Sequence, residues 1–337
     1  MSAIPTTFRA YVAERLGDRV DAGVRTLAPA DLPSGEVEIR VHWSDVNYKD
    51  ALATRFDGKV ARTSPLVPGI DLAGEVISSA DPAFRVGQEV VAHGYDLGVA
   101  RHGGYADFAR VPAAWVVPLP AGMTLREAMV LGTAGFTAAL SVKRLEDRGL
   151  RPEHGPVLVT GATGGVGSHA VSMLAGRGYE VWALTGKADE HDWLRGLGAA
   201  GFLGRDDARA DGPPLEKERW AAVVDSVGAA TLAYGLRSLR RGGALALSGN
   251  AGGAALATTV FPFILRGVAL LGIDSAYMEI AERRVLWARM ADPADLRPRS
   301  LGERVTEVTL DTLEPAIASI LAGGARGRWV VRVRDGE

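Results

Sequence analysis

The sequence predicts an α/β protein of two domains, in which an antiparallel, barrel-like domain precedes a doubly wound parallel sheet. The chain has 337 residues, 47% of them hydrophobic, which is enough for two separate cores. Short strands and turns fill roughly the first 120 residues, and a regular alternation of strands and helices begins at Val157. Residues 157–167, VLVTGATGGVG, are typical of a buried strand, a glycine-rich turn and the start of a helix.

Three segments of the first domain indicate strands. Residues 36–43 alternate apolar and polar side chains, as a half-buried strand does. Residues 68–77 and 85–92 each combine a turn with a following strand. Thr124 and Glu127 have the spacing of a capping box, which predicts a helix start soon after Pro120.

The second domain is expected to be a parallel sheet covered by helices. We expect strands at 157–160, 180–184, 220–225 and 244–248, and helices at 166–177 and 231–239. A last strand at 327–333 is expected to return to the first domain, which then consists of residues 1–122 and 295–337, with 123–294 forming the second. Because it contains Pro262 and Arg266, the apolar stretch 251–273 predicts a buried strand-and-turn region rather than a membrane span.

Composition excludes several classes of function. A net charge of −2 provides no basic field for nucleic acid or for an anionic membrane. The chain has no cysteine, which excludes disulfides and thiolate-bound zinc, and its six histidines lack ligand spacing, so no metal is expected. Residues 1–12 lack the apolar segment of a signal peptide, and we therefore expect a cytoplasmic protein.

The glycine-rich turn predicts dinucleotide binding because a strand precedes it and a helix follows it. A helix start offers unpaired N–H groups and a positive dipole end to a pyrophosphate. The same letters fit the short-chain dehydrogenases, which need a catalytic tyrosine followed four residues later by lysine. None of the seven tyrosines has a lysine at that position, and the turn lies in mid-chain, so that alternative is excluded.

The end of the second strand of this domain indicates which dinucleotide is bound. An NAD enzyme usually places an acidic side chain there for the ribose 2′-hydroxyl, but residues 183–187 read ALTGK. Thr185, Gly186 and Lys187 suit a 2′-phosphate, and Arg205 could add a second cation. The alternative is that both cations are ordinary solvated charges. The missing acid favours NADPH.

Several motifs resemble those of one superfamily. Residues 47–52 (NYKDAL) and 68–74 (PGIDLAG) resemble the quinone oxidoreductase branch of the medium-chain dehydrogenase/reductase superfamily. Residues 132–138 (GTAGFTA), 262–268 (PFILRGV) and 271–275 (LGIDS) are similar to its NADPH-dependent acrylyl-CoA reductase group. The resemblance extends from about Phe8 to Val333. It implies a GroES-like catalytic domain and a Rossmann NADP-binding domain.

The resemblance also implies a zinc-independent reductase. Zinc alcohol dehydrogenases of the superfamily carry a His-Glu pair where this chain has Ile70-Asp71. Without a Lewis acid to stabilise an alkoxide, the expected reaction is reduction of an activated C=C bond, in which the conjugated carbonyl accepts the charge. The expected substrate is an enoyl-CoA thioester of the acryloyl type. A quinone or enone substrate on the same scaffold is the alternative.

By the same resemblance, Tyr48 and Asn47 are the candidate catalytic residues, although both could merely shape the wall of the site. Asp71 is expected to brace a loop. Arg101 and His102 are candidates for the CoA phosphates, or are simply solvated. Residues 322–325 lack the amide side chains of many relatives. The implied cofactor contacts are Tyr48, Thr133, Gly161, Thr163, Gly164, Gly165, Val166, Gly167, Thr185, Gly186, Lys187, Arg205, Ser248, Asn250 and Ile273.

Two further expectations concern partners. Apolar strands around 260–273 could pair across a two-fold axis, so the resemblance implies a homodimer. A nucleotide-binding protein without catalysis is a third hypothesis, because some members of the superfamily have structural or RNA-related roles. The weak net charge and the lack of a basic, aromatic-rich patch argue against an RNA partner.

Overall fold

The computed structural model describes residues 4–209, 211–299 and 302–334. The chain divides into two compact units. The first comprises Met1–Thr133, Ala276–Ala288 and Gly302–Glu337, and the second comprises Ala134–Ser275 and Arg289–Leu301. These units differ from the predicted domains, 1–122 with 295–337 and 123–294, mainly because Ala276–Ala288 belongs to the first unit. The discontinuity arises because late segments of the chain supply a helix and strands to the first unit.

The first unit is built on a seven-stranded sheet that is almost wholly antiparallel. The strand order is β14-β15-β3-β4-β5-β7, with β6 also pairing with β3, and only β14 and β15 run parallel. A separate hairpin pairs β1 (Phe8–Leu16) with β2 (Arg19–Leu27). The strands of the sheet are β3 (Val37–Asp45), β4 (Asp71–Ser79), β5 (Glu89–His93), β6 (Phe108–Val111), β7 (Val116–Pro118), β14 (Val305–Thr309) and β15 (Arg328–Arg332).

Alternating burial explains why these segments form strands. In β3, Val37, Ile39 and Val41 are fully buried, whereas the residues between them are only partly so. The predicted strands at 36–43, 68–77 and 85–92 are found, and the last strand does return to the first unit, where β15 pairs with β3. Short helices complete the unit: α1 (Tyr48–Ala53), α8 (Glu314–Leu321) and most of α7 (Ile280–Ala291).

The long helix α2 (Leu125–Asp147) is two helical segments that meet at Gly132. Its start has the predicted capping box, in which Glu127 N–H donates to Thr124 Oγ1 (3.2 Å) and Thr124 N–H donates to Glu127 Oε2 (2.9 Å). Gly132 has φ of +50°, which favours glycine, and the boundary between the two units follows Thr133.

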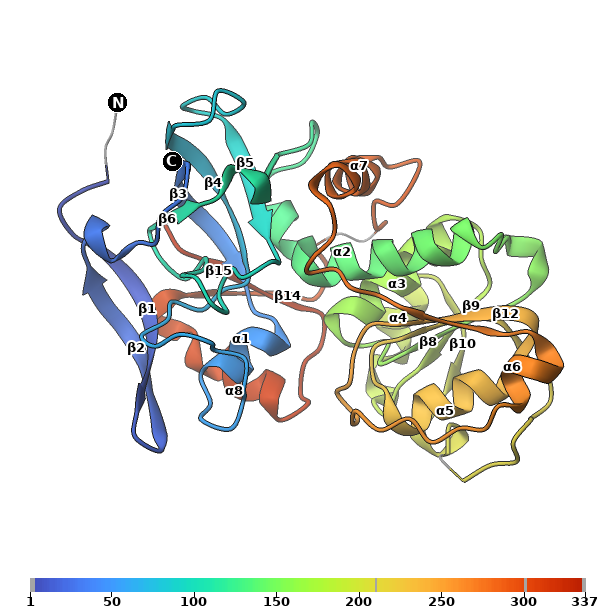
Figure 1. Ribbon diagram of the computed structural model, residues 1–337. Coiled ribbons are helices and arrows are strands. Elements are labelled where there is room, and N and C mark those ends of the chain that lie inside the picture. The colour runs from blue at the N-terminus through green and yellow to red at the C-terminus, as the bar shows by residue number, and fades with distance from the viewer. Residues whose placement is uncertain (1–3, 210, 300–301, 335–337) are drawn as a thin grey trace. The chain divides into compact units, whose positions relative to one another are not determined.

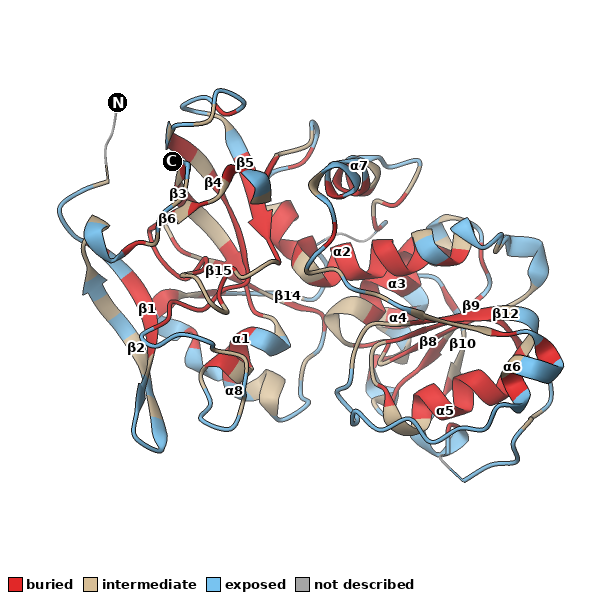
Figure 2. Ribbon diagram, in the orientation of Figure 1, coloured by how far each residue is buried: buried red, intermediate tan, exposed pale blue. Residues whose placement is uncertain are grey.

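The second unit is a six-stranded parallel sheet in the order β10-β9-β8-β11-β12-β13, as predicted for a doubly wound fold. Figure 1 shows α3 on one side of this sheet and α5 on the other. Figure 2 shows that its central strands are buried. The elements are β8 (Val157–Thr160), α3 (Gly165–Gly176), β9 (Val181–Leu184), α4 (His191–Gly196), β10 (Ala199–Leu203), β11 (Trp220–Asp225), α5 (Ala229–Ser238), β12 (Leu239–Leu247), α6 (Phe261–Arg266) and β13 (Ala269–Gly272).

One prediction about the second unit is wrong. Residues 251–273 were expected to be a buried strand-and-turn region, but residues 251–261 are all exposed. They are mostly glycine, alanine and threonine, whose small side chains have little apolar surface to bury. Only α6 and the edge strand β13 are regular there, and both are at most partly buried. In the part of the chain that the structure describes, no helix has both the length and the apolarity that a membrane span requires.

Candidate cofactor and catalytic sites

The glycine-rich turn joins β8 to α3 at the carboxyl edge of the parallel sheet (Figure 1). Gly161 has φ of +58°, and a Cβ there would lie 2.9 Å from Ser226 Oγ. A Cβ on Gly167 would lie 2.3 Å from the carbonyl oxygen of Gly161, so α3 can pack this closely against the turn only because residue 167 is glycine. Gly164, the N-cap residue, supplies no side-chain cap to α3. The turn therefore leaves N–H groups of the first helical turn, at Gly165 and Val166, for an anion.

The predicted 2′-phosphate residues lie together where β9 and β10 end. Lys187 N–H donates to Thr185 Oγ1 (3.1 Å), and Thr185 Oγ1 lies 3.5 Å from Thr163 Oγ1. A Cβ on Gly186 would lie 2.6 Å from Arg205 Nε, so the Arg205 side chain rests directly on the glycine backbone. Among the residues that the structure describes, the exposed guanidinium of Arg205 has no hydrogen bond or ion pair. These features leave Arg205 available to a phosphate.

The remaining predicted contacts of this unit follow the next strands of the sheet. Ser248 N–H donates to the Asp225 carbonyl (2.9 Å), and Ile273 N–H donates to the Leu247 carbonyl (2.9 Å). Asn250 lies in the exposed loop after β12. Sequence reasoning missed the buried Asp225 carboxylate, which accepts hydrogen bonds from Thr160, Gly228 and Thr231. It joins the ends of β8 and β11, and its position at the end of a wholly buried strand was the available signal.

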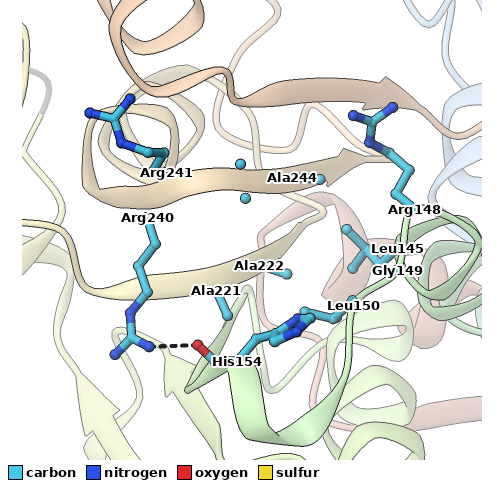
Figure 3. Close-up of a pocket in the computed structure, with 12 residues that line it drawn as sticks. Leu145, Arg148, Gly149, Leu150, His154, Ala221, Ala222, Arg240, Arg241 and Ala244 are labelled. Atoms are coloured by element: carbon cyan, nitrogen blue, oxygen red, sulfur yellow. Dashed lines mark hydrogen bonds between the residues drawn. The ribbon is translucent and has the colours of Figure 1, made fainter.

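A cavity of about 330 Å³ lies at the opposite edge of the same sheet, where the strands begin (Figure 3). Ala221 lines it near the start of β11 and Arg240 near the start of β12, together with residues of the α2–β8 loop. The arginines around it are turned outward or engaged: Arg240 donates to the His154 carbonyl (2.5 Å). Since dinucleotides bind at the carboxyl ends of parallel strands, this cavity does not belong to the nucleotide site.

The two candidate catalytic residues of the first unit have different surroundings. Tyr48 is the first residue of α1 and is 44% exposed, and its hydroxyl has no hydrogen-bond partner among the described residues. The Asn47 side chain, in contrast, is held by three other residues. Its side-chain nitrogen donates to Asp45 Oδ1 (2.6 Å) and to Asp71 Oδ2 (2.8 Å), and its oxygen accepts from Arg328 (3.4 Å). Tyr48 is therefore available to a ligand, whereas the Asn47 amide is fully engaged.

Three carboxyl groups with no exposed surface surround Asn47: Asp45, Asp50 and Asp71, of which only Asp71 was expected from its motif. Asp50 accepts hydrogen bonds from the N–H groups of Asn47, Gly69 and Ile70 at 2.8–3.0 Å. Burial and the nearby Asp71 carboxylate raise the pKa of Asp50 to about 7, although these N–H groups oppose the shift. Burial, followed by Asp71, raises the pKa of Asp45 well above its usual range.

Thr133, which the resemblance places at the cofactor, contacts Asp71 with both of its polar groups. Its N–H donates to Asp71 Oδ2 (2.8 Å) and its hydroxyl donates to Asp71 Oδ1 (2.5 Å). The hydroxyl also lies 3.3 Å from Nδ1 of His93, whose Nε2 accepts from Trp287 (2.8 Å). Burial, with Arg283 nearby, lowers the pKa of His93 well below its usual range, which keeps the ring neutral. Asp71 thus braces the segment that carries Thr133, as expected.

The candidate cations for CoA are engaged in the first unit. Arg101 donates to the Ser34 carbonyl, and its guanidinium lies 5.6 Å from the centre of the Trp115 ring. His102 Nδ1 accepts from the N–H of Val67 (3.2 Å), and burial lowers the His102 pKa. A neutral, hydrogen-bonded histidine is a poor phosphate ligand. Both residues are held by other protein groups, so the geometry favours neither the CoA contact nor the alternative of simple solvation.

The strand order and the uncapped glycine turn are those of a dinucleotide-binding domain, and the similar proteins below show that the chain is an NAD(P)-dependent oxidoreductase. Residues 33–121 match the alcohol dehydrogenase GroES-like domain, and residues 165–291 match the zinc-binding dehydrogenase domain. The chain belongs to the medium-chain dehydrogenase/reductase superfamily, close to its acrylyl-CoA reductases and quinone oxidoreductases. This confirms the fold class and the family that the motifs indicated.

Similar proteins cover nearly the whole chain. An acrylyl-CoA reductase, AcuI of Ruegeria pomeroyi, is 48% identical over 94% of this chain and 95% of its own length. YhfP of Bacillus subtilis, provisionally named a quinone oxidoreductase, is 49% identical over 97% and 99%, and its crystal structure with NAD has a TM-score of 0.94. The yhdH oxidoreductase of Salmonella enterica in complex with NADP is 46% identical over 97% and 100%, with a TM-score of 0.93.

The zinc-binding dehydrogenase match implies a metal that the residues of this chain do not fit. The chain has no cysteine, and the aliphatic Ile70 cannot bind a metal. The neighbouring Asp71 directs its oxygens at three donors. No group of three or more histidine, aspartate or glutamate side chains within 4–209, 211–299 and 302–334 is placed to hold a metal ion.

Proposed function

We propose that the protein is a zinc-independent, NADPH-dependent reductase of the activated C=C bond of α,β-unsaturated carbonyl compounds, with an acryloyl-CoA-type thioester as substrate. The product is the saturated acyl-CoA. The observation that carries this proposal is the identity of 48% with an acrylyl-CoA reductase over 94% of the chain.

The cofactor assignment rests on the second unit. The N–H groups of the first turn of α3 would hold the pyrophosphate, and Lys187 and Arg205 would hold the 2′-phosphate. No acidic side chain occupies 183–187, where an acid would repel that phosphate. The structure of the S. enterica relative is in complex with NADP and that of the B. subtilis relative has NAD bound, so a test of this chain must include both cofactors.

NADPH, when bound, supplies a hydride to the β-carbon of the substrate. Negative charge then develops on the carbonyl oxygen, and the α-carbon takes up one proton, so that hydride and proton together saturate the bond. Tyr48 is the residue of the first unit that we assign to the substrate, because its hydroxyl is exposed and has no partner among the described residues. It would donate a hydrogen bond to the developing oxyanion or a proton to the α-carbon.

The test compares substrates and cofactors in one assay. Oxidation of NADPH and of NADH is followed with acryloyl-CoA and, separately, with a quinone. The proposal expects turnover of the thioester with NADPH to exceed the other three combinations. Rapid quinone reduction without turnover of acryloyl-CoA would refute it.

A general quinone or alkene reductase is the second candidate, and one observation favours it. Arg101 and His102, the cations expected to meet CoA phosphates, are both held by other groups. YhfP, at 49% identity, is provisionally named for quinone chemistry. If this candidate is correct, acryloyl-CoA and a truncated thioester without the nucleotide should react equally well.

We also propose that the protein forms a homodimer through β13. This strand is at the edge of the six-stranded sheet, and its outer side pairs with no other strand of the described chain. Nearby, Val260, Phe261, Ile264 and Leu265 are 43–67% exposed, a cluster that a second copy would cover. Light scattering should give the mass of a dimer for the native protein, and Ile264→Asp should shift it toward a monomer. A monomeric native protein would refute the proposal.

A further inference from the structure

The buried carboxyl groups around Asn47 form a cluster that the reduction itself does not use. Asp45 ends β3, Asp71 begins β4, and Arg328 begins β15, so three strands deliver charged groups to one point. A Cβ built on Gly132 would lie 1.8 Å from Asp45 Oδ2 and 2.8 Å from Asp71 Oδ2. Both carboxyl groups therefore point at the same place beneath the break in α2.

The charges in this cluster do not balance if every acid is ionised. The groups that face Asp45 are Asp50 on α1, Asp71 on β4, Tyr105 before β6, and Arg328 on β15. His93 on β5 reaches Asp71 through Thr133, and Arg283 on α7 lies against the His93 ring. Among the described residues, Arg328 is the one cation that contacts a carboxylate of the pair, and two buried carboxylates that converge on one point cannot both stay ionised without water.

The hydrogen-bond donors show which acid keeps its charge. Asp71 accepts from Thr133 N–H, Thr133 Oγ1 and Asn47, and three donors favour a carboxylate. Trp287 and Arg283 can only donate, and both lie 2.8 Å from His93 Nε2, although Arg283 is also 2.9 Å from Nδ1. Because two donors meet Nε2, we place the hydrogen of the neutral ring on Nδ1, toward Thr133. The Thr133 hydroxyl is then left to donate to Asp71. A protonated Asp45 can accept from Arg328 and donate toward Asp71 with the same oxygen.

Asn47 connects this pair to the exposed tyrosine. One amide nitrogen donates its two hydrogens to the two acids, and the amide oxygen faces Arg328. The side chain thus has one orientation, and the next residue in the chain is Tyr48 at the first position of α1. The backbone N–H of Asn47 is also fixed, by Asp50 Oδ2 at 2.8 Å.

We propose that the Asp45–Asp71 pair holds one proton, which resides on Asp45, and one negative charge, which resides on Asp71. Through its hydrogen bonds to Asn47, this pair positions Tyr48. Asn47 is then a positioning residue and not a substrate ligand. The inference rests on the proposed function only for the role of Tyr48. The protonation state of the pair is a property of the first unit alone.

The first measurement requires no substrate. At about pH 8.5, where Asp50 is ionised, the infrared spectrum should contain the band of a protonated carboxyl group. The difference spectrum of wild type minus Asp45→Asn should contain that band. The difference spectrum of wild type minus Asp311→Asn, a control at an exposed residue, should not contain it. Absence of the band from wild type, or its persistence in Asp45→Asn, would overturn the proposal whatever the enzyme reduces.

The second measurement uses the asymmetry between the two acids. Asn at position 45 keeps an oxygen for the Asn47 amide and offers an N–H toward Asp71 in place of the acid proton, and it loses only the acceptor for Arg328. Asn at position 71 presents an N–H group to donors that Asp71 accepts from. Asp45→Asn should keep kcat within about tenfold of wild type, and Asp71→Asn should lower kcat by about a hundredfold. NADPH binding, followed by fluorescence, should change in neither variant. Equal losses in the two variants would overturn the assignment of the proton.

Asn47→Ala keeps the test informative if Asp71→Asn does not fold. This variant should keep the infrared band and NADPH binding but lower kcat by about tenfold, with a smaller effect on KM. A loss confined to KM would show that Asn47 binds substrate, and the positioning role would be wrong. If wild type reduces no thioester, kcat of the same variants is measured with a quinone as substrate. A wrong substrate assignment can then be distinguished from a wrong positioning role.

Discussion

The two units hold their functional residues in opposite ways. In the second unit the candidate phosphate ligands are at the surface, close together in sequence, and attached to a sheet whose core is apolar. In the first unit the polar groups are buried, and Asp45 and Arg328 are 283 residues apart. The two units show that local turns are sufficient to build a surface site for a charged ligand. Fixing a buried polar side chain, in contrast, requires strands that are far apart in the sequence to meet.

The largest effect is expected where the chain passes closest to the buried acids. Gly132→Ala places a methyl group against Asp45 Oδ2 at a residue with φ of +50°. We expect it to lower the free energy of unfolding by about 3 kcal/mol, measured by urea denaturation. Gly196→Ala in the second unit is the matched control, because a Cβ there meets nothing within 4 Å. Comparable stability of the two variants would contradict the geometry at Gly132.

The next effect tests the exposed phosphate ligands. Arg205→Glu and Lys187→Glu each replace a cation by an acid beside the expected 2′-phosphate. We expect NADPH affinity to fall by about a hundredfold, while NADH affinity changes little. Fluorescence titration with both cofactors measures this. Equal losses for NADPH and NADH would show that these residues do not contact the 2′-phosphate.

A third effect concerns pH and is smaller for each pH unit. The folded pKa of Asp50 is about 7 against an ordinary value of 3.8, so the folded state retains a proton that the unfolded state loses. Its contribution to stability is therefore complete below about pH 4 and is lost as the pH rises to about 7. Relative to Asp50→Asn, wild type should lose about 1.4 kcal/mol per pH unit in this window.

The pH effect of Asp50 is measured as the difference in free energy of unfolding between wild type and Asp50→Asn at each pH. Burial lowers the pKa values of His42, His93 and His102, which makes stability rise with pH up to about 6.5 in both proteins. Urea denaturation at several pH values gives the difference directly. Parallel stability curves for the two proteins would contradict a raised Asp50 pKa.

The smallest effect is at the start of α2. Thr124→Ala removes the hydroxyl that accepts from the Glu127 N–H, and should cost about 1 kcal/mol of unfolding free energy. Thr258→Ala, in the exposed loop before α6, is the control and should cost less. The cap is local and exposed, so its loss should not alter the infrared band of the buried acids.

Sequence reasoning succeeded where the signal is local. The strand, turn and helix at 157–167 and the residues at 185–187 fall as predicted, because periodicity and glycine spacing are determined within about ten residues. It failed at 251–273, where small and polar residues interrupt an apolar stretch that the structure leaves largely exposed. It also missed Asp45 and Arg328, because nothing in the sequence shows that β3 and β15 are neighbours until the sheet is known. It missed Asp50 because two of that residue's donors, Gly69 and Ile70, lie about twenty residues away.

The late position of β15 has a consequence for biosynthesis. Most of the second unit lies in one stretch, Ala134–Ser275, and can begin to fold while the ribosome is still adding residues. Asp45 and Asp71 emerge long before Arg328, whose guanidinium contacts Asp45. During translation the two acids must therefore stay protonated or hydrated until β15, which supplies Arg328, has been synthesised. A chain released before residue 328 would possess a complete nucleotide-binding sheet but not the group that closes the buried cluster.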